Sequence, residues 1–357
     1  MTYPSGPYGY GYAPPPPPPK PGVIPLAPLN FSDILTSTFT TYGRYWKPLL
    51  GVAVAAYTAA GVLVGAALLL AWAAVGDDVR RLIDLPAGQD PVYADVRPLV
   101  IAFLCVWLVA MAGYIVCGGL VYAAVPAVVQ EAVLGRPIGF GTVWRRAWSR
   151  LGAVVGSVFL AMLATVLPVV LFAAAVGLVM TSMIMGLNDG DEGVGFALGG
   201  LFLFLAALAL VPLGLWLWIR YSLAPTVAVI EGQGAVASLR RSAALVKGSW
   251  WRVFGCTLAT GLIVGMVAGV IQQVISQAAA VPMSTVGLGE EPPSVGEVLS
   301  ALGGMLAVAA VAQLLVQAVA APFQPLVSGL LYVDQRIRKE NLAPLLAQTA
   351  AEPPVSR

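Results

Sequence analysis

The sequence has no histidine and very few charged residues. Of its 357 residues only 10% are charged, whereas about 25% is usual in a soluble domain. Without histidine it can form neither a Ser-His-Asp or Cys-His hydrolytic site nor a histidine-ligated metal or haem site. The sequence also lacks a Walker loop, a zinc-protease motif, a CxxC pair and a nucleophile-elbow serine. These absences predict a protein that is not an enzyme and has no metal or other cofactor.

Long apolar runs take the place of charge. Hydrophobic residues make up 59% of the chain, and the three cysteines (Cys105, Cys117 and Cys256) all lie within the runs. Six runs contain no lysine or arginine and a single acid, Glu297: 48–75, 98–129, 151–187, 195–219, 253–281 and 297–333. About 20 apolar residues are enough to cross a bilayer. We therefore predict an all-α fold, a polytopic membrane helical bundle with six transmembrane helices.

The spans follow a period of about 100 residues. Amphipathic segments that end in arginine and tryptophan precede the first, third and fifth runs, whose apolar sequence begins at 48, 151 and 253. Tyr-x-x-x-Pro elements begin at Tyr122 and Tyr221, 99 residues apart, near the ends of the second and fourth spans. This regularity predicts three similar two-span repeats, each preceded by an amphipathic surface helix. The repeats cover about 31–131, 138–231 and 237–334.

The two ends of the chain differ from this membrane domain, which we place at 31–333. Residues 1–30 are mostly proline, glycine and tyrosine, with six consecutive prolines at 14–19. Such a composition predicts a disordered arm with a stiff polyproline II stretch. The arm is either a ligand for an aromatic-groove module or a solvated spacer. Residues 334–357 are expected to form a tail on the same side of the membrane as the N-terminal arm.

Charge is distributed unevenly between the two sides of the predicted bundle. The side that holds both termini has 16 of the 19 lysines and arginines and six acids, while the other side has three arginines and eleven acids. The net charges are +10 and −8, which sum to the formal charge of +2. Because loops on the cytoplasmic side are enriched in lysine and arginine, we predict that both termini are cytoplasmic.

Arginine and tryptophan gather near the cytoplasmic ends of the odd spans. Two explanations are open: these residues set the topology and rest on anionic headgroups of the bilayer, or they form a specific site for a lipid phosphate or a membrane protein partner. Guanidinium groups suit both, because they can bind phosphate oxygens bidentately. No feature indicates nucleic acid as a partner. The candidate lipid or partner contacts are Trp144, Arg145, Arg146, Arg240, Arg241, Trp250, Trp251 and Arg252.

The predicted spans contain polar residues but no ionisable group near their centres. This absence disfavours a transporter that uses a carboxylate relay. The candidate intramembrane polar contacts are Gln272, Gln313 and Gln317. These side chains either form hydrogen bonds between helices or line a polar path between the repeats. In the second case the protein would be a permease or a lipid-translocation component.

Four segments resemble a known family. Residues 220–232 (Arg-Tyr-Ser-Leu-Ala-Pro-Thr-Val-Ala-Val-Ile-Glu-Gly) and 237–255 are similar to the glycerophosphoryl diester phosphodiesterase membrane domain and to related actinobacterial membrane proteins. Residues 24–35 and 331–338 resemble the same proteins. The resemblance implies an integral protein of the bacterial cytoplasmic membrane with no assigned biochemical role. It implies no hydrolase activity, because the chain has neither the catalytic domain fused to some members nor its histidines.

Together these observations predict a non-enzymatic membrane protein. We expect it to bind lipid, or to organise a partner, through its cytoplasmic surface helices.

Overall fold

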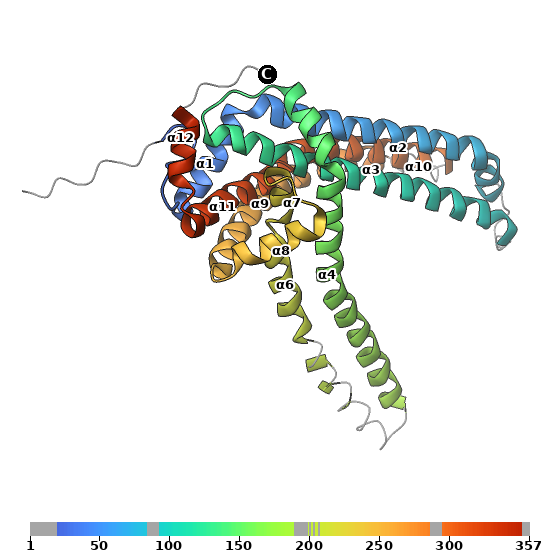
Figure 1. Ribbon diagram of the computed structural model, residues 1–357. Helices are drawn as coiled ribbons and strands as arrows, with labels where there is room; N and C mark the ends of the chain where they lie inside the picture. The colour runs from blue at the N-terminus through green and yellow to red at the C-terminus, as the bar shows by residue number, and fades with distance from the viewer. Residues whose placement is uncertain are drawn as a thin grey trace, which may run out of the picture.

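A computed structural model describes residues 20–83, 93–188, 208–285 and 295–351, together with residues 199, 201, 202, 204 and 205. Every regular element in these ranges is a helix (Figure 1). The helices are α1 (Phe31–Arg44), α2 (Trp46–Ile83), α3 (Tyr93–Val133), α4 (Phe140–Asn188), α6 (Leu210–Tyr221), α7 (Ala224–Ile230), α8 (Ala235–Val246), α9 (Trp250–Thr285), α10 (Val295–Ala320), α11 (Phe323–Glu340) and α12 (Ala343–Ala351).

Six helical segments are long and apolar enough to cross a membrane, which confirms the predicted six-span, all-α class. They are Trp46–Arg81, Val96–Val133, Phe140–Thr181, Leu210–Ile230, Trp250–Gln277 and Val311–Glu340. A helix can span lipid because it satisfies its own backbone hydrogen bonds. The chain is therefore a multi-pass membrane protein. Eight of the 25 residues of the predicted fourth span, 195–219, lie outside the described residues, and its end belongs to α6.

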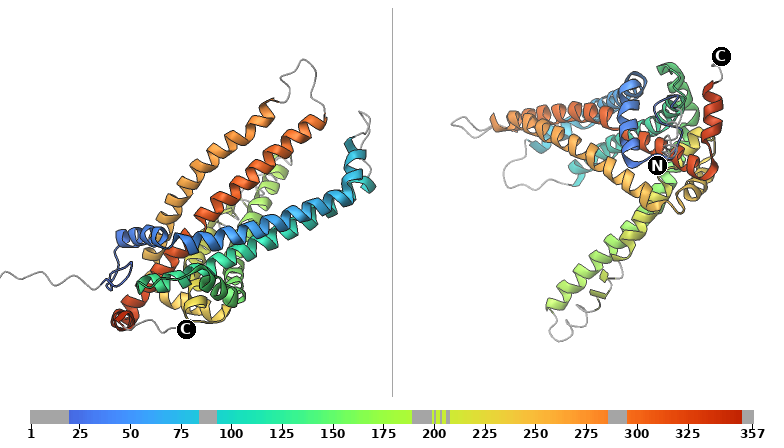
Figure 2. Two further views of the ribbon diagram at one scale, coloured as in Figure 1. Left: turned by 90° about the horizontal axis from the view of Figure 1, so that it is seen from above. Right: turned by 90° about the vertical axis from the view of Figure 1, so that its left-hand side faces the viewer.

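Three helical hairpins diverge from one packed region (Figures 1 and 2). The hairpins are α2 with α3, α4 with α6, and α9 with α10. We call the packed region the base (residues 20–57, 117–157, 219–260 and 318–346) and the opposite ends of the hairpins the tips. The continuous hydrophobic core lies within the base, whereas large apolar side chains along the hairpins are mostly exposed. Apolar surface of this extent requires lipid or another apolar partner.

The centre of the base consists of the segments in which the second, fourth and sixth spans end. These are the last turns of α3, the short helix α7 and α11, and each contacts the other two. Small residues allow this packing: the close approach of Gly329 to Val129 leaves no room for a larger side chain without movement. The predicted threefold repeat remains a prediction.

The first described segment packs against the base. The Val23 backbone N–H donates to the Ala132 carbonyl at 3.1 Å, and Val23, Ile24 and Leu29 are buried. The prediction of a disordered arm over 1–30 is therefore wrong for residues 20–30, because their apolar side chains are buried in the core. Residues 1–19 lie outside the described residues.

The predicted tail also begins too early. Helix α11 continues through Asp334 to Glu340, and Asp334, Gln335 and Ile337 are buried. The segment 334–340 belongs to the base because its carboxylate and apolar side chains have partners there. After a left-handed residue at Asn341, α12 forms a further helix over 343–351.

Only two of the segments that precede the odd spans are separate helices. Helices α1 and α8 end at breaks before α2 and α9, and Gly248, which lies in the second break, has a φ of +79°. Residues 140–150 instead form the first turns of α4, because neither glycine nor proline occurs between Thr142 and Leu151 to interrupt the helix.

We expect Gly22→Ala to destabilise the base. A Cβ atom at Gly22 would overlap the Ala132 and Val133 carbonyl groups, which are backbone atoms and cannot rotate away. Overpacking of this kind costs about 1–3 kcal/mol. The apparent melting temperature of the detergent-purified protein should fall. The matched control is Gly43→Ala in α1, where an added Cβ meets nothing within 4 Å; equal melting temperatures for the two variants would contradict the packing of this segment.

Candidate functional site

A fully buried carboxylate, Asp334, joins three parts of the base. Its Oδ1 accepts the Leu29 backbone N–H at 2.9 Å and the Arg338 Nε–H at 3.0 Å, and its Oδ2 accepts the Arg252 Nε–H at 3.0 Å. Both arginines also donate to the Leu29 carbonyl oxygen, Arg338 at 2.8 Å. The residues lie on the N-terminal segment, α9 and α11, so this one site connects both ends of the sequence. A buried charge is tolerated only when it is paired and hydrogen-bonded in this way.

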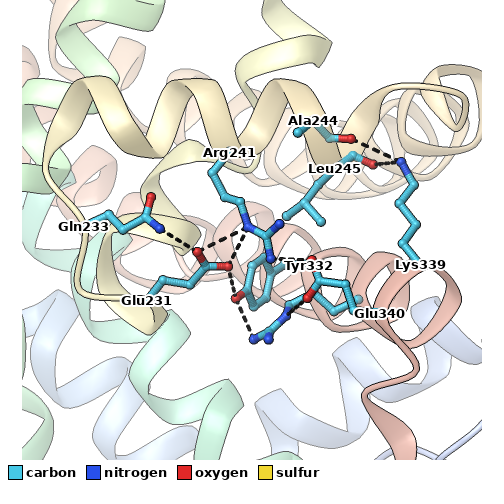
Figure 3. Close-up of polar contacts among 9 residues, drawn as sticks. Glu231, Gln233, Arg241, Ala244, Leu245, Tyr332, Lys339 and Glu340 are labelled. Carbon is cyan, nitrogen blue, oxygen red and sulfur yellow. Dashed lines mark hydrogen bonds and ion pairs between the residues drawn. The ribbon is translucent and has the colours of Figure 1, made fainter.

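A second polar site forms a closed ring between α7, α8 and α11 (Figure 3). Arg241 on α8 donates from Nε to Glu231 Oε1 at 3.0 Å and from Nη2 to Glu340. Glu340 accepts from Arg336 Nε at 2.7 Å, and Arg336 donates to the Tyr332 hydroxyl at 3.1 Å. The hydroxyl of Tyr332 then donates to Glu231 Oε1 at 2.8 Å. Each charge therefore has a partner of opposite sign, and the three helices are held together.

The ring raises the pKa of the Arg241 guanidinium. Partial burial by itself would lower the pKa of its guanidinium, but the hydrogen bonds and charges of Glu231 and Glu340 outweigh that effect and raise it. Beside the ring, Lys339 caps the end of α8 by donating to the carbonyl oxygens of Leu245 at 2.7 Å and Lys247 at 2.6 Å. The last carbonyls of a helix have no partner within the helix, so a cation is favourable there.

A third ion pair connects the end of α3 with the start of α4. Arg146 Nη1 lies 3.6 Å from Glu131 Oε1, and Arg150 donates to the Gly232 carbonyl at 3.0 Å. Arg146 and Arg241 are both the seventh residue of their helices, and each pairs with the acid at the end of the preceding return segment. Asp334 is the corresponding acid near the end of the sixth span, and it accepts the backbone N–H of Leu29, just before α1.

The predicted lipid or partner contacts fall into three groups in the structure. Arg146, Arg241 and Arg252 pair with carboxylates of the base and hold the fold together. Trp144 and Trp250 are partly buried and pack against the core. The remaining three predicted residues, Arg145, Arg240 and Trp251, are exposed.

Exposed aromatic rings mark the point where each odd span leaves the base. Trp46, Trp148 and Trp251 are exposed at the starts of α2, α4 and α9. Phe39 on α1 and Phe140 on α4 are exposed as well. Four of these five rings, all but Trp251, were not among the predicted lipid or partner contacts, although Trp46 and Trp148 lie in the arginine- and tryptophan-rich segments that precede the first and third spans. Aromatic rings of this kind are enriched at membrane–water interfaces.

The inward face of α1 consists mainly of small polar side chains. Its buried residues are Ile34, Ser37, Thr38 and Thr41, and the Thr38 and Thr41 hydroxyls donate to carbonyls of their own helix at 2.7 and 2.6 Å. Small, internally satisfied side chains thus allow close packing against the base. The ring of Phe39 is half exposed, and it meets the ring of Phe323 on α11 edge-on with 5.6 Å between the ring centroids.

All described acidic residues of the base are engaged within the fold. Glu131, Glu231, Asp334 and Glu340 form ion pairs, and Asp33 accepts the Asn30 backbone N–H at 2.8 Å at the start of α1. Six cations of the base are exposed and, within the described part of the chain, form neither an ion pair nor a side-chain hydrogen bond: Lys20, Arg44, Lys47, Arg145, Arg240 and Lys247. The accessible charge of the base is therefore positive.

The predicted intramembrane glutamines lie on the third hairpin. Gln272 and Gln317 are partly buried and Gln313 is exposed. Among the described residues, no side-chain hydrogen bond joins Gln272 to either of the other two. The polar path stays a prediction. Among the residues that the structure describes, no group of three or more cysteines and acids is placed to hold a metal ion.

Comparisons with protein-family models, with curated proteins and with solved structures found no match to this chain. The resemblance to the glycerophosphoryl diester phosphodiesterase membrane domain therefore stays a prediction. Any functional conclusion must come from the geometry of the base and the hairpins.

We expect Asp334→Ala to destabilise the protein severely. The change leaves Arg252 and Arg338 without their buried carboxylate, and breaking a buried pair from one side costs about 3–5 kcal/mol. The measurement is the apparent melting temperature in detergent. The control is Asp77→Ala, which removes an exposed pair with Arg80 that contributes ~0–1 kcal/mol. A small, equal shift for both variants would show that the Asp334 site is not a major source of stability.

Proposed function

We propose that this is a non-enzymatic protein of the bacterial cytoplasmic membrane that binds anionic lipid headgroups through its base. The base faces the cytoplasm in this proposal, so both termini are cytoplasmic. One observation carries the proposal: the described acids of the base all have partners within the fold, whereas six of its described cations are exposed and form neither an ion pair nor a side-chain hydrogen bond.

The position of the free cations supports a lipid surface as their partner. Lys47 directly follows the exposed Trp46, and Arg145 lies three residues before the exposed Trp148. A cation beside an interfacial aromatic ring is suited to the headgroup region, where the ring contacts the acyl boundary and the charge contacts phosphate. Each lysine or arginine near an anionic leaflet contributes about 1 kcal/mol.

The arrangement of the exposed residues favours a lipid surface over a single small ligand. They are distributed over α1, α2, α4, α8 and the segments next to them, in a base from which three hairpins diverge (Figure 2). Separated anchors fit a two-dimensional surface better than one phosphate.

The orientation is tested by labelling single cysteines in a variant that lacks the three native cysteines. With the base in the cytoplasm, Asp77→Cys near a tip should react with a membrane-impermeant maleimide on intact bacterial cells. Arg240→Cys on the base should react only after permeabilisation. Both positions are exposed, so access to the reagent is not limited by the fold. The reverse pattern would overturn the proposed orientation.

Lipid binding is tested by replacing exposed cations that have no role in the core. We expect the double variant Arg145→Gln, Arg240→Gln to retain fewer anionic lipids through mild detergent extraction, as counted by native mass spectrometry. At about 1 kcal/mol per cation, each change should weaken lipid binding about fivefold. The matched control is Arg80→Gln, Arg81→Gln near a tip.

The two double variants remove the same charge, so total charge cannot explain a difference between them. Melting temperatures should remain near that of the native protein, because none of the four arginines belongs to the base's internal ion pairs. Unchanged retention of anionic lipid in the base variant would refute the proposal. A protein that is lost together with the lipid would instead identify a partner as the ligand of this surface.

A further inference from the structure

The first hairpin contains an apolar groove of about 590 Å³ on its tip half, far from the base. On α2 it is lined by residues from Ala67 to Val75, and on α3 by residues from Arg97 to Val109. Small side chains open it: Ala67, Ala71, Ala74, Ala102 and Cys105 are among its lining residues. Such a groove matches small-ligand sites in volume.

The groove ends where the two helices come together. Nearer the base, the Cys117 thiol donates to the Ala56 carbonyl at 3.0 Å, and a Cβ built on Gly113 would lie 3.4 Å from that of Ala60. Close packing at one end and small residues at the other give a groove that is closed toward the base and open toward the tip.

The length of the groove matches one leaflet. Its α3 wall runs from Arg97 to Val109, which is ~18 Å at 1.5 Å per residue. Half of the hydrocarbon core is ~15 Å. The groove therefore extends from the headgroup level to about the middle of the bilayer.

Arg97 supplies a charge at the headgroup end. It is exposed and, within the described residues, forms no ion pair, whereas Arg80 and Arg81 pair with Asp77 and Asp78. A guanidinium group binds a phosphate through two parallel hydrogen bonds. The rest of the lining is apolar apart from the weakly polar thiol of Cys105. An extended peptide would leave its backbone groups unsatisfied there, which makes a hydrocarbon chain the better occupant.

We propose that this groove binds one acyl chain of an anionic phospholipid, whose phosphate is held by Arg97. The occupant belongs to the leaflet at the tips, so the site is separate from the lipid surface of the base. Only its assignment to the outer leaflet rests on the proposed orientation.

The test uses the full-length protein in nanodiscs that contain phosphatidylglycerol with a photoactivatable group in one acyl chain. After illumination, the cross-linked residues are mapped by mass spectrometry. We expect cross-links to concentrate on the groove, for example at Ala102 and Cys105, above the level at the neighbouring exposed residues Phe103 and Leu104. Equal labelling of both pairs would indicate surrounding lipid only and would overturn the proposal.

Two matched pairs of variants separate the chain from the headgroup. Ala71→Phe fills the groove and should reduce labelling of Ala102 to the level of Phe103, whereas Ala73→Phe, an exposed position outside the lining, should not. Arg97→Gln should weaken the competition by unlabelled phosphatidylglycerol about tenfold, while Arg80→Gln should not. Because Arg97 is exposed, Arg97→Gln should leave the fold intact. It therefore still tests the proposal if Ala71→Phe misfolds.

The remaining outcomes identify other occupants, and each would overturn the proposal. A fatty-acid probe of equal chain length that labels the groove and is not displaced by phosphatidylglycerol would assign the site to a free fatty acid. Competition by phosphatidylcholine equal to that by phosphatidylglycerol would remove the role of the anionic headgroup. Cross-links from Cys105 to a second copy of the chain would show a protein interface.

Discussion

The buried carboxylate of Asp334 is the constraint on which the base depends. A charge with no access to water must be neutralised by nearby cations and hydrogen-bond donors. Here these come from Arg252, Arg338 and the backbone of Leu29, which lie on three segments far apart in sequence. The requirement therefore fixes α9, α11 and the N-terminal segment relative to one another. The hairpins diverge from this connection, and their apolar surfaces are left for lipid.

Arginine has two roles in the same region, and geometry separates them. Arg240 and Arg241 are neighbours in the sequence, yet Arg241 belongs to the ring with Glu231 and Glu340 while Arg240 is exposed. Successive residues of a helix are rotated by about 100°, so one side chain can face the base and the next can face outward. Internal use of every described acid of the base has a further effect: it leaves the exposed cations without competition for anionic headgroups.

The sequence-based prediction succeeded for the features that depend on composition. Long uncharged runs cannot form anything but spans, so the six-span class was predictable. The ends of the membrane domain could not be predicted in this way. Residues 20–30 resemble a disordered arm in composition, and Asp334 resembles the start of a solvated tail, because composition does not record which distant groups will pair. The acids Glu131, Glu231 and Asp334 recur at intervals of about 100 residues, and this spacing could have identified them as ion-pair partners.

The sequence by itself determined the environment of the protein and the uneven distribution of its charge, since hydropathy and the position of each charge along the chain are local properties. The tertiary structure decided which charges are free and which are internal. That distinction depends on contacts between residues such as Leu29 and Asp334, 305 positions apart. It also decided that the small residues of α2 and α3 face each other in a groove, with Arg97 at its open end. No local pattern contains this information, because a pairing or a groove exists only when two separate helices have packed.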